Sequence, residues 1–182
     1  MAQENRQKEL TQVRELAQIY LENPCSIPSA PKLEMCRSIL RLWVYPSFED
    51  HLAWHVFRRD RSGKDSAIVR RVKWDQEADW RRLAGDPLLG LRTGFHATPT
   101  IEVRDRQLGE AVLKGYMEQL KAVSIPIGAG KGTVGIDGTT SGVEVFPGRV
   151  LVEWWSVYPP EWEGLVSWAS VMREWLDGVC AA

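Results

Sequence analysis

Residues 132–178 read GTVGIDGTTSGVEVFPGRVLVEWWSVYPPEWEGLVSWASVMREWLDG. In the first half of this stretch, β-branched residues alternate on both sides of a Phe-Pro-Gly turn: Val143, Val145, Val150 and Val152. This alternation predicts a β-hairpin, part of a meander over about residues 133–156. Pro159 and Pro160 then stop the last strand, and from Glu161 onward the apolar period changes to about 3.6, so a helix is expected to follow.

The C-terminal helix carries two apolar stripes where a surface helix needs only one. A core-facing arc consists of Trp162, Leu165, Val166, Ala169, Met172, Leu176 and Val179. A second stripe consists of Trp168, Val171 and Trp175. Either the first helix of the chain covers the second stripe, or another protein chain binds it, which can be a second copy in a homodimer. Trp168, Val171 and Trp175 are therefore the candidate partner-binding residues.

Upstream, the alternation of residues 37–74 predicts an antiparallel meander with strands at 38–45, 52–59 and 66–74. An amphipathic helix is expected from about residue 5, ending before Asn23-Pro24. A second helix is expected over 76–85, capped by Asp75, and a third after a short strand at 100–103, capped by Asp105. The chain is thus predicted to be α+β, with helices packed against antiparallel meanders.

Two short segments of the chain resemble each other. Val72, Trp74, Asp79, Trp80 and Leu83 have the same order as Val152, Trp154, Glu161, Trp162 and Leu165. The plain interpretation is that a tryptophan pair holds each helix to its own sheet, and the alternative is an architecture of two similar halves.

Length and charge limit the classes of protein that need to be considered. The chain has 182 residues and a formal net charge of −1. This length predicts a single domain over residues 1–182, with a division into 1–90 and 91–182 as the alternative. The near-neutral charge predicts no overall attraction to nucleic acid or to anionic lipid. The polar N-terminus and the lack of a long apolar run predict a cytoplasmic protein that makes no membrane contact.

The cysteines match neither a metal site nor a redox motif. Cys25, Cys36 and Cys180 are odd in number and widely spaced, so they are expected to be reduced thiols.

A cluster of acidic residues and histidines, Glu49, Asp50, His51 and His55, could serve a hydrolase. On a helix the two histidines would lie one turn apart and could bind zinc. On a strand they share a face about 13 Å apart, at roughly 3.3 Å per residue, which is too far for one ion. Because Trp54, Val56 and Phe57 lead into a hairpin turn, the strand is favoured. Asp137 is a further hydrolase candidate, although a turn residue before Gly138 is the simpler interpretation.

The second predicted hairpin, residues 58–73, is rich in positive charge. Its basic residues include Arg58, Arg59, Arg61, Arg70, Arg71 and Lys73. Arginines near exposed aromatic side chains could bind phosphates and stack on bases. Alternatively, these side chains pair with acids on neighbouring elements.

The run GAGKGT at residues 128–133 is similar to the phosphate loop of adenylate kinases. A phosphate loop follows a strand and opens a helix, whereas this run is preceded by a predicted helix and followed by predicted strands. This run is therefore expected to form a surface turn, and the chain is expected to bind no cofactor.

The C-terminal quarter resembles a group of small uncharacterised bacterial proteins. These proteins combine a D-G-T-[ST] hairpin, a tryptophan pair and a P-P-x-W helix start. The matching residues here are Asp137, Gly138, Thr139, Thr140, Trp154, Trp155, Pro159, Pro160 and Trp162. The resemblance implies a bacterial source and implies no activity.

The leading hypothesis is a non-catalytic, cytoplasmic protein-interaction protein. The alternatives are a nucleic-acid-binding module that uses the arginine-rich hairpin and a hydrolase that uses Asp50, His51 and His55.

Overall fold

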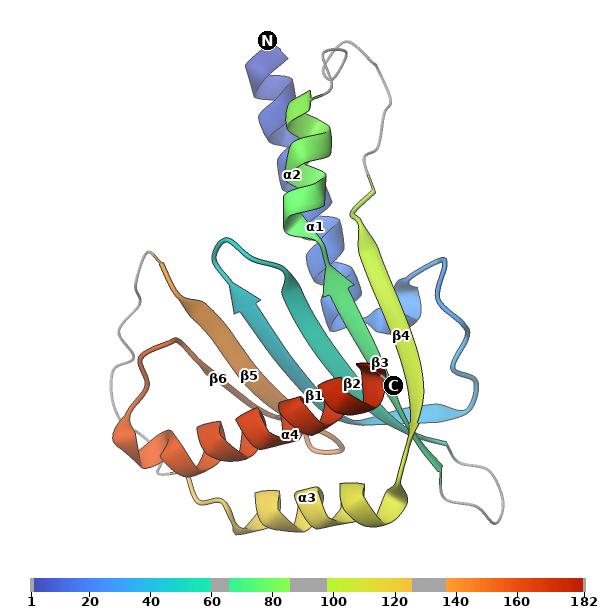
Figure 1. Ribbon diagram of the computed structural model, residues 1–182, viewed down its shortest axis with the longest axis vertical. Helices are drawn as coiled ribbons and strands as arrows, with labels where there is room; N and C mark the ends of the chain where they lie inside the picture. The colour runs from blue at the N-terminus through green and yellow to red at the C-terminus, as the bar shows by residue number, and fades with distance from the viewer. Residues whose placement is uncertain (1, 60–65, 86–97, 126–136, 182) are drawn as a thin grey trace.

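A computed structural model describes residues 2–59, 66–85, 98–125 and 137–181. Its centre is a six-stranded antiparallel sheet with the strand order β4-β3-β2-β1-β5-β6 (Figure 1). The strands are β1 (Cys36–Pro46), β2 (His51–Arg59), β3 (Ser66–Trp74), β4 (Ile101–Leu108), β5 (Thr139–Val145) and β6 (Val150–Trp154). Both predicted meanders belong to this one sheet, because β1 pairs with β5 from Leu40 to Pro46.

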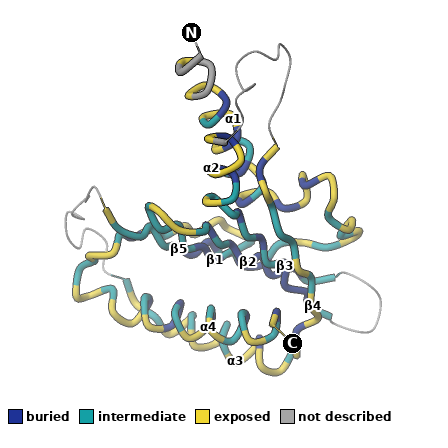
Figure 2. Tube along the Cα trace, turned by 45° about the horizontal axis from the view of Figure 1, so that its top comes forward, coloured by how far each residue is buried: buried dark blue, intermediate teal, exposed yellow. Residues whose placement is uncertain are grey.

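The helices form two layers around the sheet (Figures 1 and 2). They are α1 (Ala2–Glu22), α2 (Gln76–Gly85), α3 (Glu110–Ala122) and α4 (Glu163–Ala181), with short 3-10 turns η1 (Pro24–Ser26) and η2 (Pro160–Trp162). Helices α3 and α4 cover one face of the sheet, and α1 covers the other. Helix α2 continues from β3 and lies beside α1, where the pair projects beyond the sheet. The predicted α+β architecture is confirmed.

The alternation of side chains along the strands creates a hydrophobic core on each face. Leu40, Leu42 and Trp54 face α3 and α4 and pack against Leu165, Met172 and Leu176 among others. On the opposite face, Trp43, Ala53, Val72 and Trp74 pack against three α1 residues: Val13, Ala17 and Leu21. The central strands therefore contribute to both cores, which explains why they are the most deeply buried part of the chain (Figure 2).

Local signals in the sequence set several element boundaries correctly. Helix α2 begins where Asp75 accepts a hydrogen bond from the Ala78 N–H at 2.8 Å, as the predicted cap requires. The strand predicted over residues 66–74 is β3. Among the described residues, no helix has both the length and the apolar character needed to cross a membrane.

The prediction for β4 and α3 was wrong. Asp105 does not cap a helix, because strand β4 continues from Ile101 to Leu108 and pairs with β3 along its whole length. Helix α3 instead starts at Glu110, after Gly109 as its N-cap. Asp105 lies opposite Arg70 in the sheet, and this long-range ion pair explains why the strand does not end before it.

Candidate functional site

The two histidines lie on strand β2, as predicted, and each is engaged within the fold. His55 Nε2 is 2.8 Å from the carbonyl oxygen of Leu21, and His51 Nε2 is 3.1 Å from that of Pro46. Burial is the main cause that lowers the pKa of both rings, that of His55 to about 3. Asp50 is paired instead with Lys73, at 2.6 Å. The three hydrolase candidates therefore do not converge on a common point, and in the described part of the chain no group of three or more His, Cys, Asp or Glu side chains could hold a metal ion.

His55 belongs to a row of polar side chains that crosses five strands on the face covered by α1. In the order of the strands, the row is Glu144, Arg41, His55, Arg70 and Asp105. Arg41 lies 3.5 Å from Glu144, and Arg149 donates a hydrogen bond of 2.9 Å to the same carboxylate. Because opposite charges lie at both ends, the buried cations of the row have partners.

Arg70 is the most buried member of this row, with 1% of its surface exposed. Its guanidinium donates to both carboxylate oxygens of Asp105, at 2.7 and 2.6 Å. It also donates to the carbonyl oxygens of Pro24 and Pro31, at 3.1 and 2.6 Å. Arg70 therefore fixes the proline-rich connector after α1 onto the sheet, and its side chain is not available to an external ligand.

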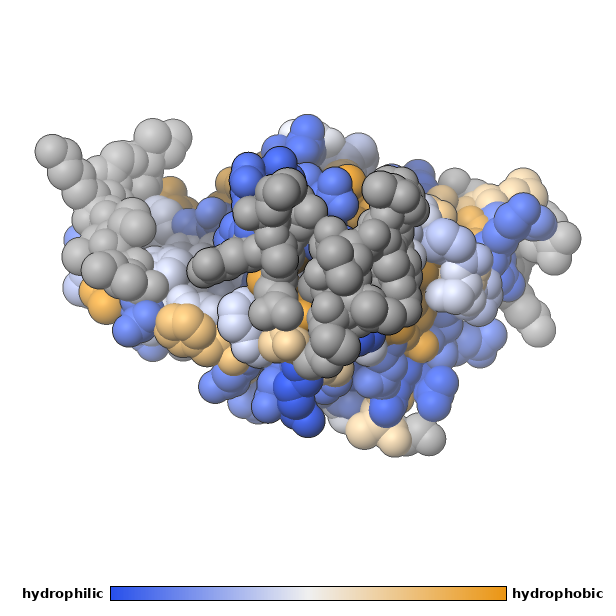
Figure 3. Space-filling view, turned by 90° about the horizontal axis from the view of Figure 1, so that it is seen from above, coloured by the Kyte–Doolittle hydropathy of each residue, from blue (hydrophilic) through white to orange (hydrophobic). Residues whose placement is uncertain are grey.

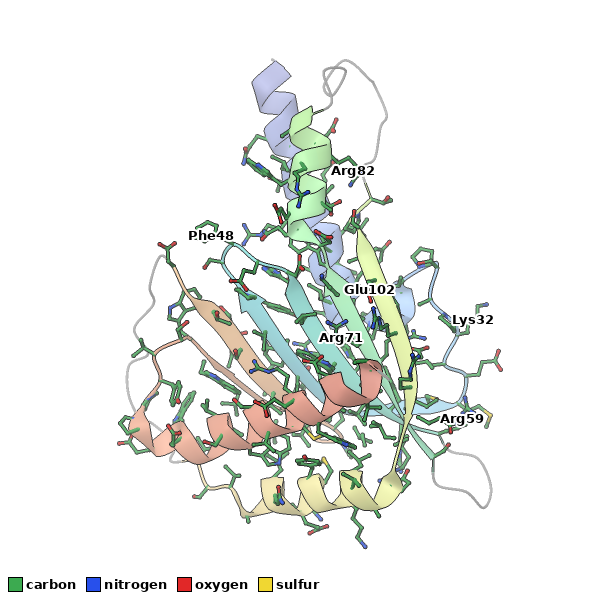
Figure 4. All side chains as sticks on the ribbon, viewed as in Figure 1. Lys32, Phe48, Arg59, Arg71, Arg82 and Glu102 are labelled. Carbon is green, nitrogen blue, oxygen red and sulfur yellow. The ribbon has the colours of Figure 1, made fainter. Side chains whose placement is uncertain are left out.

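The other members of the predicted basic patch also have neighbours of opposite charge. Lys73 pairs with Asp50, as described above, Arg58 lies 3.7 Å from Glu110, and Arg71 lies 3.1 Å from Asp177. These three side chains lie on the α3–α4 face, opposite the side chain of Arg70 (Figure 4 labels Arg59 and Arg71). Arg59 is half-buried, and Arg61 lies outside the described residues. The basic side chains are thus divided between the two faces of the sheet.

The second tryptophan stripe of α4 lies next to α3. The Trp168 side chain is 6% exposed, and its indole N–H donates to the Tyr116 carbonyl oxygen at 2.9 Å. Trp175 stacks on the Tyr116 ring with centroids 5.0 Å apart. Val171 is 52% exposed. Trp168 is therefore covered within the chain and is not a partner contact, but the covering helix is α3 and not the first helix, because α1 packs against the opposite face of the sheet.

The Asp-Gly-Thr-Thr motif connects the start of β5 to the β1–β2 turn. The Gly138 carbonyl oxygen accepts hydrogen bonds from the Ser47 N–H and hydroxyl, at 2.9 and 2.8 Å. A Cβ atom at Gly138 would lie 2.6 Å from the Trp155 ring, so the glycine is needed for that close approach. Asp137 is exposed. The phosphate-loop-like run at 128–133 lies outside the described residues.

A cleft of about 530 Å³ lies between α1, α2 and the β1–β2 turn. Its apolar lining includes Leu10 and Val13 from α1 and Trp74 from the end of β3. Two large aromatic side chains at its edge are exposed to solvent, Phe48 by 80% and Trp80 by 59%. Figure 4 shows Phe48 at the tip of the β1–β2 turn. Figure 3 looks onto this end of the molecule, where hydrophobic patches interrupt a mostly hydrophilic surface.

Hydrogen bonds to Asp79 hold one wall of the cleft in place. The Trp74 indole N–H donates to Asp79 at 2.7 Å, and the Thr100 hydroxyl and N–H donate at 2.6 and 2.9 Å. Arg82 adds an ion pair at 2.7 Å. Burial alone would raise the pKa of Asp79, but these hydrogen bonds outweigh it and lower that pKa. The carboxylate therefore stays charged and fixes α2 to the ends of β3 and β4.

No pattern in the sequence predicts the cleft. Phe48 and Trp80 carry a local signal, since Phe48 interrupts the polar turn Ser47–Asp50 and Trp80 lies on the exposed side of α2. Their proximity depends on three segments that are distant in sequence. No protein-family model, curated protein or solved structure matches this chain, so the geometry of the cleft carries the functional conclusion.

Proposed function

We propose that this chain is a non-catalytic protein-interaction protein and that its docking site is the cleft edged by Phe48 and Trp80. The observation that carries the proposal is the exposure of these two large aromatic side chains beside a cleft with an apolar lining. Aromatic residues dominate the binding energy of protein interfaces, particularly where they meet an apolar pocket. Exposed aromatic surface in this arrangement is typical of a site that another polypeptide covers.

The chemistry of the surrounding polar groups supports binding rather than catalysis. The Asp79 carboxylate, which lines the cleft, already accepts hydrogen bonds from Trp74, Thr100 and Arg82. A general base needs a free lone pair within reach of its substrate, and Asp79 uses its oxygens to hold the wall of the cleft. The remaining lining combines the apolar surface of Leu10, Phe48 and Trp80 with polar side chains such as Thr11 and Arg14.

The proposal includes a bacterial, cytoplasmic setting. Cys25 is exposed, Cys36 is half-buried and Cys180 is buried, and all three are free thiols. An exposed free thiol suits a reducing compartment.

The test is site-specific photocrosslinking in cells. A photoreactive phenylalanine analogue is placed at Phe48, at Trp80 and, as a matched control, at Val171, which is a similarly exposed apolar residue on α4. We expect covalent adducts to a polypeptide from positions 48 and 80 and none from 171. The adduct from position 48 should disappear in the Trp80→Ser background. The proposal is wrong if neither position gives a polypeptide adduct, or if Val171 gives the same adduct.

A further inference from the structure

The cleft and its most exposed aromatic residue lie on the same end of the molecule. Phe48 contributes to the rim, and 80% of its surface faces solvent. It therefore forms an apolar projection beside an apolar depression. A surface with both features is self-complementary, because two copies related by a two-fold axis can exchange projections.

Two charged side chains near the cleft, one basic and one acidic, are also placed so that two copies could pair them. Arg14 lines the cleft and is exposed, and Glu49 follows Phe48 at the tip of the turn and is exposed as well. Among the described residues, neither side chain has an ion pair, whereas the other charged residues of the lining are paired: Glu77 with Arg81 and Asp79 with Arg82. An unpaired cation inside the cleft and an unpaired anion beside the projection lie where one copy would meet another.

We propose that the occupant of the cleft is a second copy of this chain, an inference that rests on the proposed function of the same site. In the two-fold dimer, the Phe48 ring of each protomer enters the partner's cleft and contacts Leu10 and Trp80, which are lining residues with accessible apolar surface. The Glu49 carboxylate then pairs with the partner's Arg14. The contact occurs twice, so one surface supplies both halves of the interface.

The available apolar area fits a dimer of modest size. A large aromatic side chain buries about 150 Å² or more, so two Phe48 and two Trp80 side chains contribute on the order of 600 Å². This is more than half of the roughly 1,000 Å² that marks the lower limit of specific interfaces. Polar side chains around the two clefts, Arg14 and Glu49 among them, contribute to the remainder.

The experiment measures the oligomeric state of the full chain by sedimentation velocity and native mass spectrometry. We expect a dimer at a concentration on the order of 10 µM. Phe48→Ser should yield a monomer, and Val171→Ser, on the opposite side of the molecule, should remain dimeric. Arg14→Glu and Glu49→Arg should each raise the dissociation constant at least about tenfold, because each places two like charges together.

The double variant Arg14→Glu/Glu49→Arg is the decisive measurement. It restores opposite charges at both contacts, so its dissociation constant should return toward that of the unmodified chain. Circular dichroism spectra and melting temperatures of all variants check that these exposed substitutions leave the fold intact.

Three outcomes would overturn the inference: a monomeric unmodified chain, a dimer that survives Phe48→Ser, or single charge variants that the double variant fails to rescue. The photocrosslinking experiment separates the two proposals. A monomer whose position 48 crosslinks to a different protein refutes the second copy and leaves the docking site standing. The absence of any polypeptide adduct refutes both.

Discussion

The imidazole of His55 is a titratable group fully enclosed between α1 and the sheet. It lies between Arg41 and Arg70 in the polar row, and its Nε2 is 2.8 Å from the Leu21 carbonyl oxygen. Since the carbonyl oxygen can only accept, Nε2 carries a hydrogen, and the lowered pKa of the ring keeps it neutral at pH 7. Burial is the largest cause that lowers its pKa to about 3, and the two neighbouring cations act in the same direction.

This pKa predicts how stability depends on pH. Above about pH 6.5, His55 is neutral in both states and makes no pH-dependent contribution. Below that value the unfolded chain takes up a proton that the folded chain cannot bind until about pH 3, so stability falls as the pH falls. Between pH 7 and pH 5 this contribution amounts to about 2 kcal/mol. Because glutamine does not titrate, we expect the unfolding free energy of the His55→Gln variant, measured with urea, to fall by this amount less between pH 7 and pH 5. The Gln amide can still donate to the Leu21 carbonyl oxygen, which preserves the local hydrogen bond.

The comparison of the two pH profiles isolates His55. His51 and the carboxylates are present in both proteins, so their contributions cancel in the difference. If the unfolding free energies of the two proteins ran parallel from pH 7 to pH 5, His55 would not have the lowered pKa that its burial implies.

At the scale of elements, the pairing of β1 with β5 depends on a glycine. Gly142 lies opposite Trp43, and a Cβ atom there would be 2.0 Å from the Trp43 ring. The Trp43 ring is itself buried and cannot move aside without disturbing the core beneath α1. Gly142→Ala is therefore expected to lower the free energy of unfolding by about 2 kcal/mol or more, measured by urea denaturation.

The matched control is Gly115→Ala in α3. A Cβ atom at Gly115 meets nothing within 4 Å, and alanine has the higher helix propensity. This substitution should stabilise the protein by about 0.5–1 kcal/mol. Equal effects of the two substitutions would contradict the close approach of Trp43 to β5.

The contrast between β3 and β4 explains which elements the sequence can predict. Strand β3 and helix α2 have their signals within a few residues, namely the alternation of Ser66–Trp74 and the Asp75 cap. Strand β4 extends to Leu108 through pairing with β3, and its Asp105 is stabilised by Arg70, which is 35 positions away. From its neighbours in the sequence alone, an aspartate that caps a helix cannot be distinguished from an aspartate within a strand whose ion-pair partner is distant in sequence.

The same reasoning applies to the candidate site. The exposure of Phe48 and Trp80 could be suspected from an apolar residue in a polar turn and on the outer side of a helix. Their position beside one cleft follows from the packing of α1 and α2 at the end of the sheet, which no local pattern encodes. Trp168 is the converse case, because it looks like an exposed residue in the helical pattern of α4 and is buried by α3, a helix that is distant in sequence.

At the scale of the whole molecule, the sheet is shared by two hydrophobic cores. Strands β1, β2 and β3 send alternate side chains to α1 on one face and to α3 and α4 on the other. Loss of either helical layer exposes one face of the strands that support the other layer. The cleft depends on the same arrangement, because α1 and Trp74 supply part of its lining.

Two leucines test whether the layers unfold together. Leu21 in α1 and Leu176 in α4 are both fully buried, one in each core. Leu→Ala at either position removes packing contacts and leaves a cavity, so each variant should lose about 2–5 kcal/mol of unfolding free energy. Since the central strands belong to both cores, we expect urea transitions followed by far-UV circular dichroism and by tryptophan fluorescence to coincide in each variant. Trp43 and Trp74 report on one core and Trp54 and Trp168 on the other, so a fluorescence transition that separates from the loss of helix would show that the two layers unfold independently.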